Sequence, residues 1–311
     1  MEKKATRESY GAALAELGEK YDFVVLDADL AEATKTVVFK KKFPERFFDC
    51  GIAEGNMMSV AAGIATTGKA VFASSFAMFA AGRAFEQIRN SIGYPHLNVK
   101  IGATHAGITV GEDGATHQCN EDIALMRTIP GMTIINPADA IEARAAVEAA
   151  LNINGPVYMR FGRYAVPTFN GEDYKFELGK GVLLSDGADV TVVASGLTVH
   201  LALEAKDMLA AEGISARVIN MHTIKPLDTA ILENAAKETG AIVTAEEHSV
   251  IGGLGSAVAE AVSASFPVPV LRVGIEDTFG RSGTVPALLE AYGLTAKAIY
   301  EKAKAAIALK K

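Results

Sequence analysis

The chain has 311 residues, of which 50% are hydrophobic and 22% are charged, and its formal net charge is −7. This is the composition of a globular protein of about two domains, and the acidic balance excludes a nucleic-acid backbone as the main partner. Because the chain has only two cysteines, no apolar signal-peptide run at its amino terminus and no uncharged stretch long enough to span a membrane, we expect a cytoplasmic protein without a membrane partner.

The first half of the chain alternates short apolar runs with helical patterns. A helix capped by Thr6 is predicted to run to about Lys20, and the apolar run at 22–29, which ends in acids, is typical of a buried strand. Asn136 and Pro137 predict a helix start, with an asparagine cap and a proline at the first helical position. The other elements predicted here are strands at 69–73, 97–101, 132–135 and 157–160, helices at 54–67, 75–91, 120–126 and 137–152, and an irregular charged stretch between 30 and 47.

The alternation stops at residues 166–181, where Pro167, Gly171 and scattered charges indicate a linker. A second alternating unit follows, and such alternation implies a parallel sheet with helices on both faces. We therefore predict an α/β fold with two domains, residues 1–165 and 182–311, each a mostly parallel sheet flanked by helices. The elements predicted in the second unit are strands at 190–194, 216–220, 241–245 and 270–273 and helices at 199–211, 229–237, 255–265 and 296–309.

The densest group of titratable residues lies at 102–118, directly after a predicted strand. This segment contains two histidines, an acidic pair and four glycines. Glycines permit tight turns and close backbone approach to a ligand, while imidazoles and carboxylates bind or move protons. Open α/β sheets place ligands at the ends of their strands. The alternative is a turn-rich surface loop, but the density of these residues favours a ligand site.

Several other residues have two interpretations. Glu54 begins a predicted helix, where a carboxylate is favourable near the positive end of the helix dipole. Phe76 and Phe79 fit either core packing or a pocket for a flat aromatic ligand, and Arg160 fits either an anion contact or a surface ion pair. The glycine-rich turn at 252–255 resembles a phosphate cradle, although a tight strand-to-helix turn is favoured. No His, Cys, Asp and Glu cluster has the spacing of a metal site, so we expect no metal ligands.

Taken together, these motifs resemble transketolases. The stretch 110–118 (Val-Gly-Glu-Asp-Gly-Ala-Thr-His-Gln), preceded by Thr104-His105, is similar to the family's substrate loop. Gly51-Ile52-Ala53-Glu54 is similar to the segment with the glutamate that activates thiamine diphosphate. The resemblance implies a pyrimidine-binding domain followed by a transketolase carboxy-terminal domain. Further similar segments are Ala5-Thr6-Arg7 (a substrate-phosphate arginine), Ser74–Gly82 (an aromatic pocket) and Ala28-Asp29-Leu30 (near the cofactor).

The chain departs from the family pattern in one respect. Transketolases bind the diphosphate and the metal through a further domain that carries Gly-Asp-Gly, and this sequence has no Gly-Asp-Gly. The resemblance therefore implies the carboxy-terminal subunit of a split transketolase in pentose phosphate metabolism, active only with an amino-terminal subunit. That partner is expected to hold most of the diphosphate and Mg²⁺ or Ca²⁺, in a heterotetramer with two copies of each chain.

The resemblance also implies roles for individual residues. Thiamine diphosphate is expected to contact Asp29, Ile52, Glu54, Phe76 and Phe79; Glu54 would favour the reactive tautomer of the aminopyrimidine, and Phe76 would stack on it. A sugar phosphate is expected to contact Arg7, His105, Asp113, His117 and Arg160, with Asp113 on a hydroxyl, His117 at the reacting end and Arg163 as an alternative to Arg160. Catalysis would then depend on Glu54, His105 and His117.

Three other functions fit parts of this pattern. The β subunit of a 2-oxo acid dehydrogenase has the same two domains and also needs a partner chain. A synthase that joins pyruvate to glyceraldehyde phosphate shares the architecture, but we expect it as one continuous chain. A non-catalytic partner protein of the same fold would not need Glu54, Asp113 and His117 together. The 110–118 stretch and Arg7 favour a sugar phosphate, and hence a transketolase.

Overall fold

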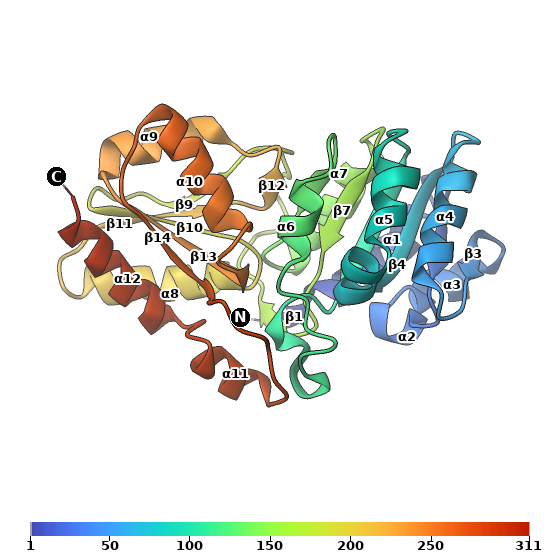
Figure 1. Ribbon diagram of the computed structural model, residues 1–311, viewed down its shortest axis with the longest axis horizontal. Coiled ribbons are helices and arrows are strands. Elements are labelled where there is room, and N and C mark those ends of the chain that lie inside the picture. Colours follow the sequence, from blue (N-terminus) through green and yellow to red (C-terminus); the bar gives the residue numbers. More distant parts are fainter. Residues whose placement is uncertain (1, 311) are drawn as a thin grey trace.

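The computed structural model describes residues 2–310, which form two α/β units side by side, with the amino terminus near their junction (Figure 1). This confirms the predicted α/β fold with mostly parallel sheets flanked by helices. No helix within the described residues is both long enough and apolar enough to cross a membrane.

The first unit is built on a seven-stranded sheet. Its neighbouring strands are parallel except at the β12 edge, where β12 pairs antiparallel with β6. In order across the sheet, the strands are β12 (Thr223–Lys225), β6 (Thr133–Ile135), β7 (Val157–Arg160), β5 (Val99–Thr104), β4 (Ala70–Phe76), β2 (Phe23–Asp27) and β3 (Phe47–Asp49). A separate antiparallel pair consists of β1 (Lys3–Ala5) and β8 (Ala165–Pro167).

Helices cover both faces of this sheet because its strands are apolar on both sides. One core contains Leu14 and Val147, from α1 and α7, together with Phe72 of β4, whereas Met57 of α4 packs with Leu26 of β2 in a second core. The helices are α1 (Thr6–Leu17), α2 (Ala31–Thr34), α3 (Val37–Lys42), α4 (Glu54–Ala65), α5 (Phe85–Gln87), α6 (Asp122–Arg127) and α7 (Ala140–Leu151). The 3₁₀ helices are η1 (Pro44–Arg46) and η4 (Ile108–Asp113), and the π-helices are η2 (Met78–Arg83) and η3 (Ile88–Gly93).

The second unit has a five-stranded sheet in which only β9 is antiparallel. In order, its strands are β14 (Val270–Ile275), β13 (Ile242–Ser249), β10 (Val190–Ala194), β11 (Ala216–Asn220) and β9 (Val182–Ser185). Its helices are α8 (Thr198–Ala210), α9 (Thr229–Thr239), α10 (Leu254–Ser265), α11 (Val285–Ala291) and α12 (Ala296–Ala308).

Two predicted helix starts are wrong. Phe76 is the last residue of β4, not part of a helix, because it pairs with Thr104 of the neighbouring strand. The helix predicted at 137–152 begins at Ala140, and its cap is Asp139, whose carboxylate accepts a hydrogen bond from the Glu142 N–H (2.9 Å). The side chain of Asn136 instead donates to the Ser195 hydroxyl in the second unit (3.1 Å).

Thr6 is also not a cap. It is the first helical residue of α1, and its hydroxyl accepts a hydrogen bond from the Gly162 N–H (2.9 Å). The stretch between 30 and 47, predicted to be irregular, contains α2, α3 and η1. The sequence pattern also missed the short strands β1, β3, β8, β9 and β12 and the helix α11. These elements are too short to show a clear hydrophobic period.

Two carboxylates at the start of α7, those of its cap Asp139 and of Glu142, hold residues 166–181 in place. The second oxygen of Asp139 accepts from the N–H groups of Phe169 (3.0 Å) and Asn170 (2.8 Å). Glu142 accepts from the Tyr174 hydroxyl and from the Asn220 side chain, and burial raises the pKa of Glu142 to about 7. Residues 166–181, predicted as a linker, are therefore held against α7 by hydrogen bonds.

Asp139→Ala is expected to lower the free energy of unfolding by about 2–4 kcal/mol, because it removes both a helix cap and two charge-assisted hydrogen bonds. Urea unfolding followed by circular dichroism measures this loss. Asp139→Asn is the matched variant: its amide oxygen can still cap Glu142, but its NH₂ group cannot accept from Phe169 or Asn170, so an intermediate loss is expected. A variant as stable as the native chain would contradict this role.

Candidate active site

The candidate site lies where β4 and β5 end. The two strands pair in parallel with Phe76 opposite Thr104, so His105, the next residue, leaves the sheet beside Phe76. Their rings stack with centroids 3.7 Å apart. Phe79 lies nearly parallel to Phe76 at 5.7 Å, and His117 meets the Phe79 ring edge-on at 5.3 Å. Four of the predicted site residues thus form one aromatic cluster.

Arg7 and Thr104 fix the protonation of His105. The Arg7 guanidinium lies 2.9 Å from His105 Nε2, and the Thr104 hydroxyl lies 2.9 Å from Nδ1. Because a guanidinium can only donate, Nε2 must accept, which places the imidazole proton on Nδ1. Burial lowers the pKa of His105 to about 3, and the Arg7 charge contributes in the same direction. His105 is therefore a neutral hydrogen-bonding group and not a cation.

A second arginine links Glu54 to the aromatic cluster. Glu54 is the first residue of α4, with its side chain 1% exposed, and its carboxylate accepts from Arg83 (2.9 Å). The Arg83 guanidinium carbon lies 4.7 Å from the centre of the Phe79 ring. Glu54 thus lies at the amino terminus of a helix, where the dipole favours a carboxylate, and is linked through Arg83 to the Phe79 ring. Arg83 was not recognised in the sequence, because its partner lies on another element.

The segments that carry Asp29 and Ile52 are joined by one carboxylate. Asp49 Oδ1 accepts from the N–H groups of Asp29 (3.1 Å) and Gly51 (3.0 Å). The Ile52 side chain is 76% exposed. An exposed isoleucine next to a buried glutamate offers an apolar surface to a ligand or a partner chain.

Asp27 holds the turn that contains Asp29. Its carboxylate accepts from Leu30 N–H and from the hydroxyls of Thr34 and Thr36, at 2.7, 2.7 and 2.9 Å. Burial raises the pKa of Asp27 to about 6. The sequence showed an acid at the end of this strand, but not that it organises the turn.

Asp113 and the arginines near it have different surroundings. Asp113 is exposed at the end of η4. Arg163 is partly exposed, and its guanidinium donates to the Val110 carbonyl and to the exposed Glu112 carboxylate (3.4 Å). Burial lowers the pKa of Arg7 and the Arg163 charge lowers it further, so the two arginines share one electrostatic environment.

The structure does not bring Arg160 together with the other predicted substrate residues. Arg160 is only 3% exposed, and its guanidinium donates to the Asp122 carboxylate (2.8 Å) and to the Glu247 carbonyl (2.8 Å). Its charge is compensated inside the protein. Arg163, the alternative to Arg160, is more exposed, and its carboxylate partner Glu112 lies at the surface, so Arg163 has the exposure that an anion contact requires.

The glycine-rich turn of the second unit is not an empty phosphate cradle. Glu246 fills it: one carboxylate oxygen accepts from Leu254 N–H (2.6 Å), and the other accepts from Gly255 N–H (2.7 Å). The amino terminus of α10 therefore already has its anion, as in a strand-to-helix turn. Within residues 2–310, no group of three or more His, Cys, Asp or Glu side chains has the arrangement of a metal site.

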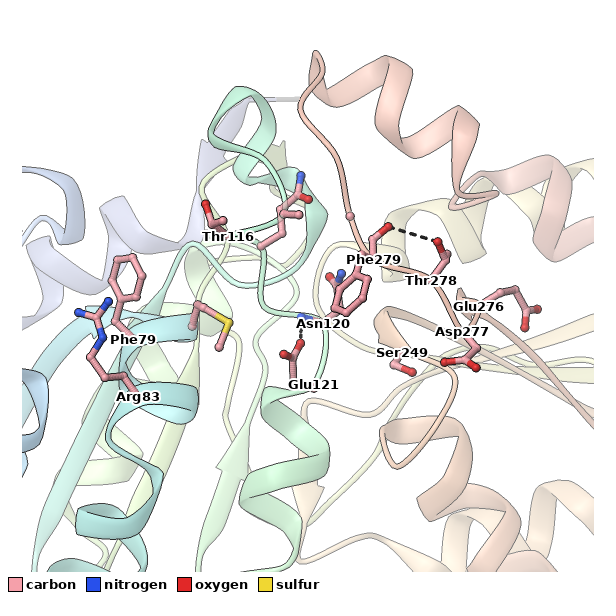
Figure 2. A pocket seen from close by; sticks show the side chains of 14 residues that line it. Phe79, Arg83, Thr116, Asn120, Glu121, Ser249, Glu276, Asp277, Thr278 and Phe279 are labelled. Atoms are coloured by element: carbon pink, nitrogen blue, oxygen red, sulfur yellow. Dashed lines mark hydrogen bonds between the residues drawn. The ribbon is translucent and has the colours of Figure 1, made fainter.

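A cavity of about 680 Å³ opens between the two units beside this cluster. Figure 2 shows Phe79 and Arg83 on one side of it, Thr116 and Asn120 near its middle, and the 276–279 turn of the second unit on the other side. The volume suits a small-molecule ligand. Both units thus contribute walls to the space next to the candidate site.

In the ligand-free chain, the His105 imidazole is expected to stay neutral down to about pH 5, because burial and Arg7 depress its pKa to about 3. The depressed pKa means that neutral His105 favours the folded state above pH 6.5, and that this contribution is lost as the pH falls towards 3. Nitrogen-15 NMR of the imidazoles measures the titration, with His105→Gln identifying the resonance. A midpoint near the ordinary value of about 6.5 would contradict the buried geometry.

Comparison with known proteins gives matches over both units. The family model for the transketolase pyrimidine binding domain matches residues 2–168, and that for the transketolase C-terminal domain matches residues 179–299. A transketolase C-terminal section from Methanocaldococcus jannaschii is 52% identical over 96% of this chain and 95% of the relative. A 6-deoxy-6-sulfo-D-fructose transketolase subunit from a Clostridium species is 45% identical over 97% of this chain and 94% of the relative.

A solved structure has the same architecture throughout. It is described as a split gene transketolase in an inactive beta4 tetramer, and it is 56% identical to this chain, with a TM-score of 0.91 over 99% of both chains. The matches include the strands and helices that carry the aromatic cluster, Glu54 and the 102–118 segment. The chain therefore belongs to the transketolase family and is similar to its split-gene members.

Proposed function

We propose that this chain is the carboxy-terminal subunit of a thiamine-diphosphate-dependent transketolase, which transfers a two-carbon ketol unit from a ketose phosphate to an aldose phosphate. The observation that carries the proposal is the gathering of Arg7, His105, Phe76, Phe79 and His117 at one edge of the sheet. An anion-binding group, a flat apolar surface and a second imidazole are what this reaction needs from the protein.

The residues present fit thiamine diphosphate, which transketolases generally use together with a divalent metal ion. The Phe76 and Phe79 rings offer flat apolar surface, and Glu54 is a buried carboxylate linked to Phe79 through Arg83. When bound, the cofactor supplies an electron sink for the carbon–carbon bond cleavage. Glu54 would hydrogen-bond the aminopyrimidine and hold a proton there, and Phe76 would stack on that ring. Asp29 and Ile52 would complete the cofactor side of the site.

The sugar would lie between the aromatic cluster and the 102–118 segment. Arg7 Nε is buried and has no acceptor among residues 2–310, so it is a free donor for an anionic oxygen. Arg7 and Arg163 would hold the phosphate. Neutral His105 would orient Arg7 by accepting its hydrogen bond at Nε2. Asp113 would accept from a sugar hydroxyl, and His117 would donate to or accept from the reacting end.

The proposal includes an amino-terminal partner subunit that holds most of the diphosphate and the metal. Support comes from the relatives, which are described as a C-terminal section, a subunit and an inactive assembly of a split-gene chain. A heterotetramer with two copies of each chain follows if each active site lies between the two kinds of chain. These relatives also favour a transketolase over the β subunit of a 2-oxo acid dehydrogenase.

The anionic end group of the sugar is the part of the substrate most open to variation. One relative is named for a sulfonated fructose. Phosphate and sulfonate both present several oxygens to arginine, so both suit Arg7 and Arg163. We propose phosphate, so a phosphorylated ketose should be a better donor than its sulfonated counterpart when the two are compared in the same ketol-transfer assay.

The chain mixed with its amino-terminal partner is expected to transfer ketol units only when thiamine diphosphate and Mg²⁺ are added, whereas the chain alone is expected to be inactive. Co-purification followed by an enzyme-coupled ketol-transfer assay with each component omitted in turn measures this. Glu54→Gln is the matched variant: it should assemble with the partner but lose at least about a hundredfold in kcat, because the amide cannot hold the proton. Activity of the single chain, or near-normal turnover of the Glu54 variant, would refute the proposal.

Arg7→Ala and Arg163→Ala are each expected to raise KM for a phosphorylated ketose by roughly tenfold to a hundredfold, through the loss of charge-assisted hydrogen bonds. KM for an unphosphorylated ketose should change much less. Arg144→Ala is the control, because Arg144 forms surface ion pairs with Glu16 and Glu148. Steady-state kinetics of the assembled enzyme measure both KM values. Equal increases in KM for the phosphorylated and the unphosphorylated ketose would show that the substituted arginine does not bind the phosphate.

A further inference from the structure

The carboxyl end of β13, in the second unit, lies against the 102–118 segment and the residues after it, up to the first turn of α6. Because each contact crosses between the units, the strand end acts as a support under the proposed substrate site. Three consecutive residues make these contacts: Glu247 Oε1 accepts from Thr109 N–H (2.7 Å), His248 Nε2 accepts from Ala124 N–H (3.3 Å), and Ser249 N–H donates to the Asn120 carbonyl (2.7 Å).

Glu247 has the most constrained contact of the three. Its side chain is buried, and the backbone of Gly107 runs directly over its carboxylate. A Cβ atom at Gly107 would lie 2.3 Å from Glu247 Oε1, and Gly107 has a φ of +77°. Both the close approach and the left-handed backbone require glycine. The segment is therefore shaped to fit this carboxylate.

Arg160 balances the charge of Glu247 inside the protein. Burial raises the pKa of Glu247, and the positive charge of Arg160 opposes that rise. The guanidinium also donates to the Glu247 carbonyl (2.8 Å) and to Asp122 (2.8 Å), which in turn accepts from the Tyr158 hydroxyl (2.9 Å). Removing one member of such a buried charged group leaves the others without compensation.

The second unit holds the other end of the segment as well. Gln118 Nε2 donates to the carbonyls of Ile108 (3.1 Å) and Gly111 (3.4 Å) and to that of Arg281 in the second unit (3.0 Å). The α11 helix packs against η4. The stretch that carries Asp113 and His117 is thus fixed by Glu247 at Thr109 and by Arg281 at Gln118.

We infer that Glu247 is a positioning residue: the carboxy-terminal unit uses its buried carboxylate to hold residues 107–118 so that Asp113 and His117 face the sugar. The catalytic part of this inference rests on the proposed function. The mechanical part does not, since it concerns only the order of the segment. The carboxy-terminal unit is then part of the substrate site in addition to any role in assembly.

Hydrogen exchange of the full chain, analysed peptide by peptide, tests the mechanical part without any activity. Glu247→Ala should speed exchange within 107–118 by about tenfold or more, because Thr109 N–H loses a charge-assisted acceptor. Glu247→Gln keeps an acceptor oxygen and should restore most of the protection. Glu246→Gln is the matched control on the same strand: Glu246 is equally buried, but its carboxylate accepts from Leu254 and Gly255 and lies 3.8 Å from His248 Nδ1, so exchange within 107–118 should not change.

Kinetics of the chain assembled with its partner test the catalytic part. Glu247→Ala should lower kcat/KM for the sugars by about a hundredfold, since a displacement of about 1 Å costs that much, while the affinity for thiamine diphosphate stays within about twofold. Glu246→Gln should leave kcat/KM unchanged.

Native exchange rates in Glu247→Ala, or native kcat/KM in that variant, would overturn the inference. If Glu247→Ala does not fold, Glu247→Asp replaces it: the charge remains but the oxygen is withdrawn, so faster exchange supports the inference and native exchange overturns it. If the native assembly shows no ketol transfer, the proposed function fails, and exchange alone then decides whether Glu247 holds the segment.

Discussion

The candidate site depends on one constraint, the in-register pairing of β4 with β5. With Phe76 opposite Thr104, the chain leaves β5 at His105 directly beside the Phe76 ring. Phe79 and His117 then pack around that pair, and Arg7 reaches His105 from α1. A shift of one residue would turn these side chains to the opposite face of the sheet. The site is thus a property of sheet register more than of any single loop.

Burial shifts the pKa values of several groups near the ends of these strands and at the contact between the units. It lowers the pKa of His105 and raises those of Asp27 and Glu247. Each of these groups is hydrogen-bonded, and the two carboxylates accept from backbone N–H groups of the turns that carry the predicted ligand contacts. Such fixed dipoles and charges do not have to reorganise during a reaction, which is how preorganised sites lower barriers. The rigidity of the turns and the electrostatics of the site therefore have the same cause.

The sequence predicts the buried strands of the sheets well. It fails at residues whose position depends on a partner far away in the sequence. The bounds of β10 and β11 match the prediction, because buried parallel strands are continuous apolar runs. The local pattern predicts a helix cap at Asn136, but the cap is Asp139. The Asp139 carboxylate also accepts from Phe169 N–H in the 166–181 stretch, a contact that local sequence does not show. Phe76 is assigned to a predicted helix because local sequence does not show that it pairs with Thr104 of the neighbouring strand. The buried position of Arg160 could not be predicted either, since its partner Asp122 lies 38 residues away in sequence.

The strand β12 belongs to the second unit by sequence but is the edge strand of the first unit's sheet, paired with β6. Cutting the chain within residues 166–181 would place these two strands on separate polypeptides and leave the outer edge of β6 unpaired, while its other edge stays paired with β7. An open edge of this kind recruits strands from other molecules, including copies of itself. The sheet of the first unit is therefore complete only when both units lie on one polypeptide.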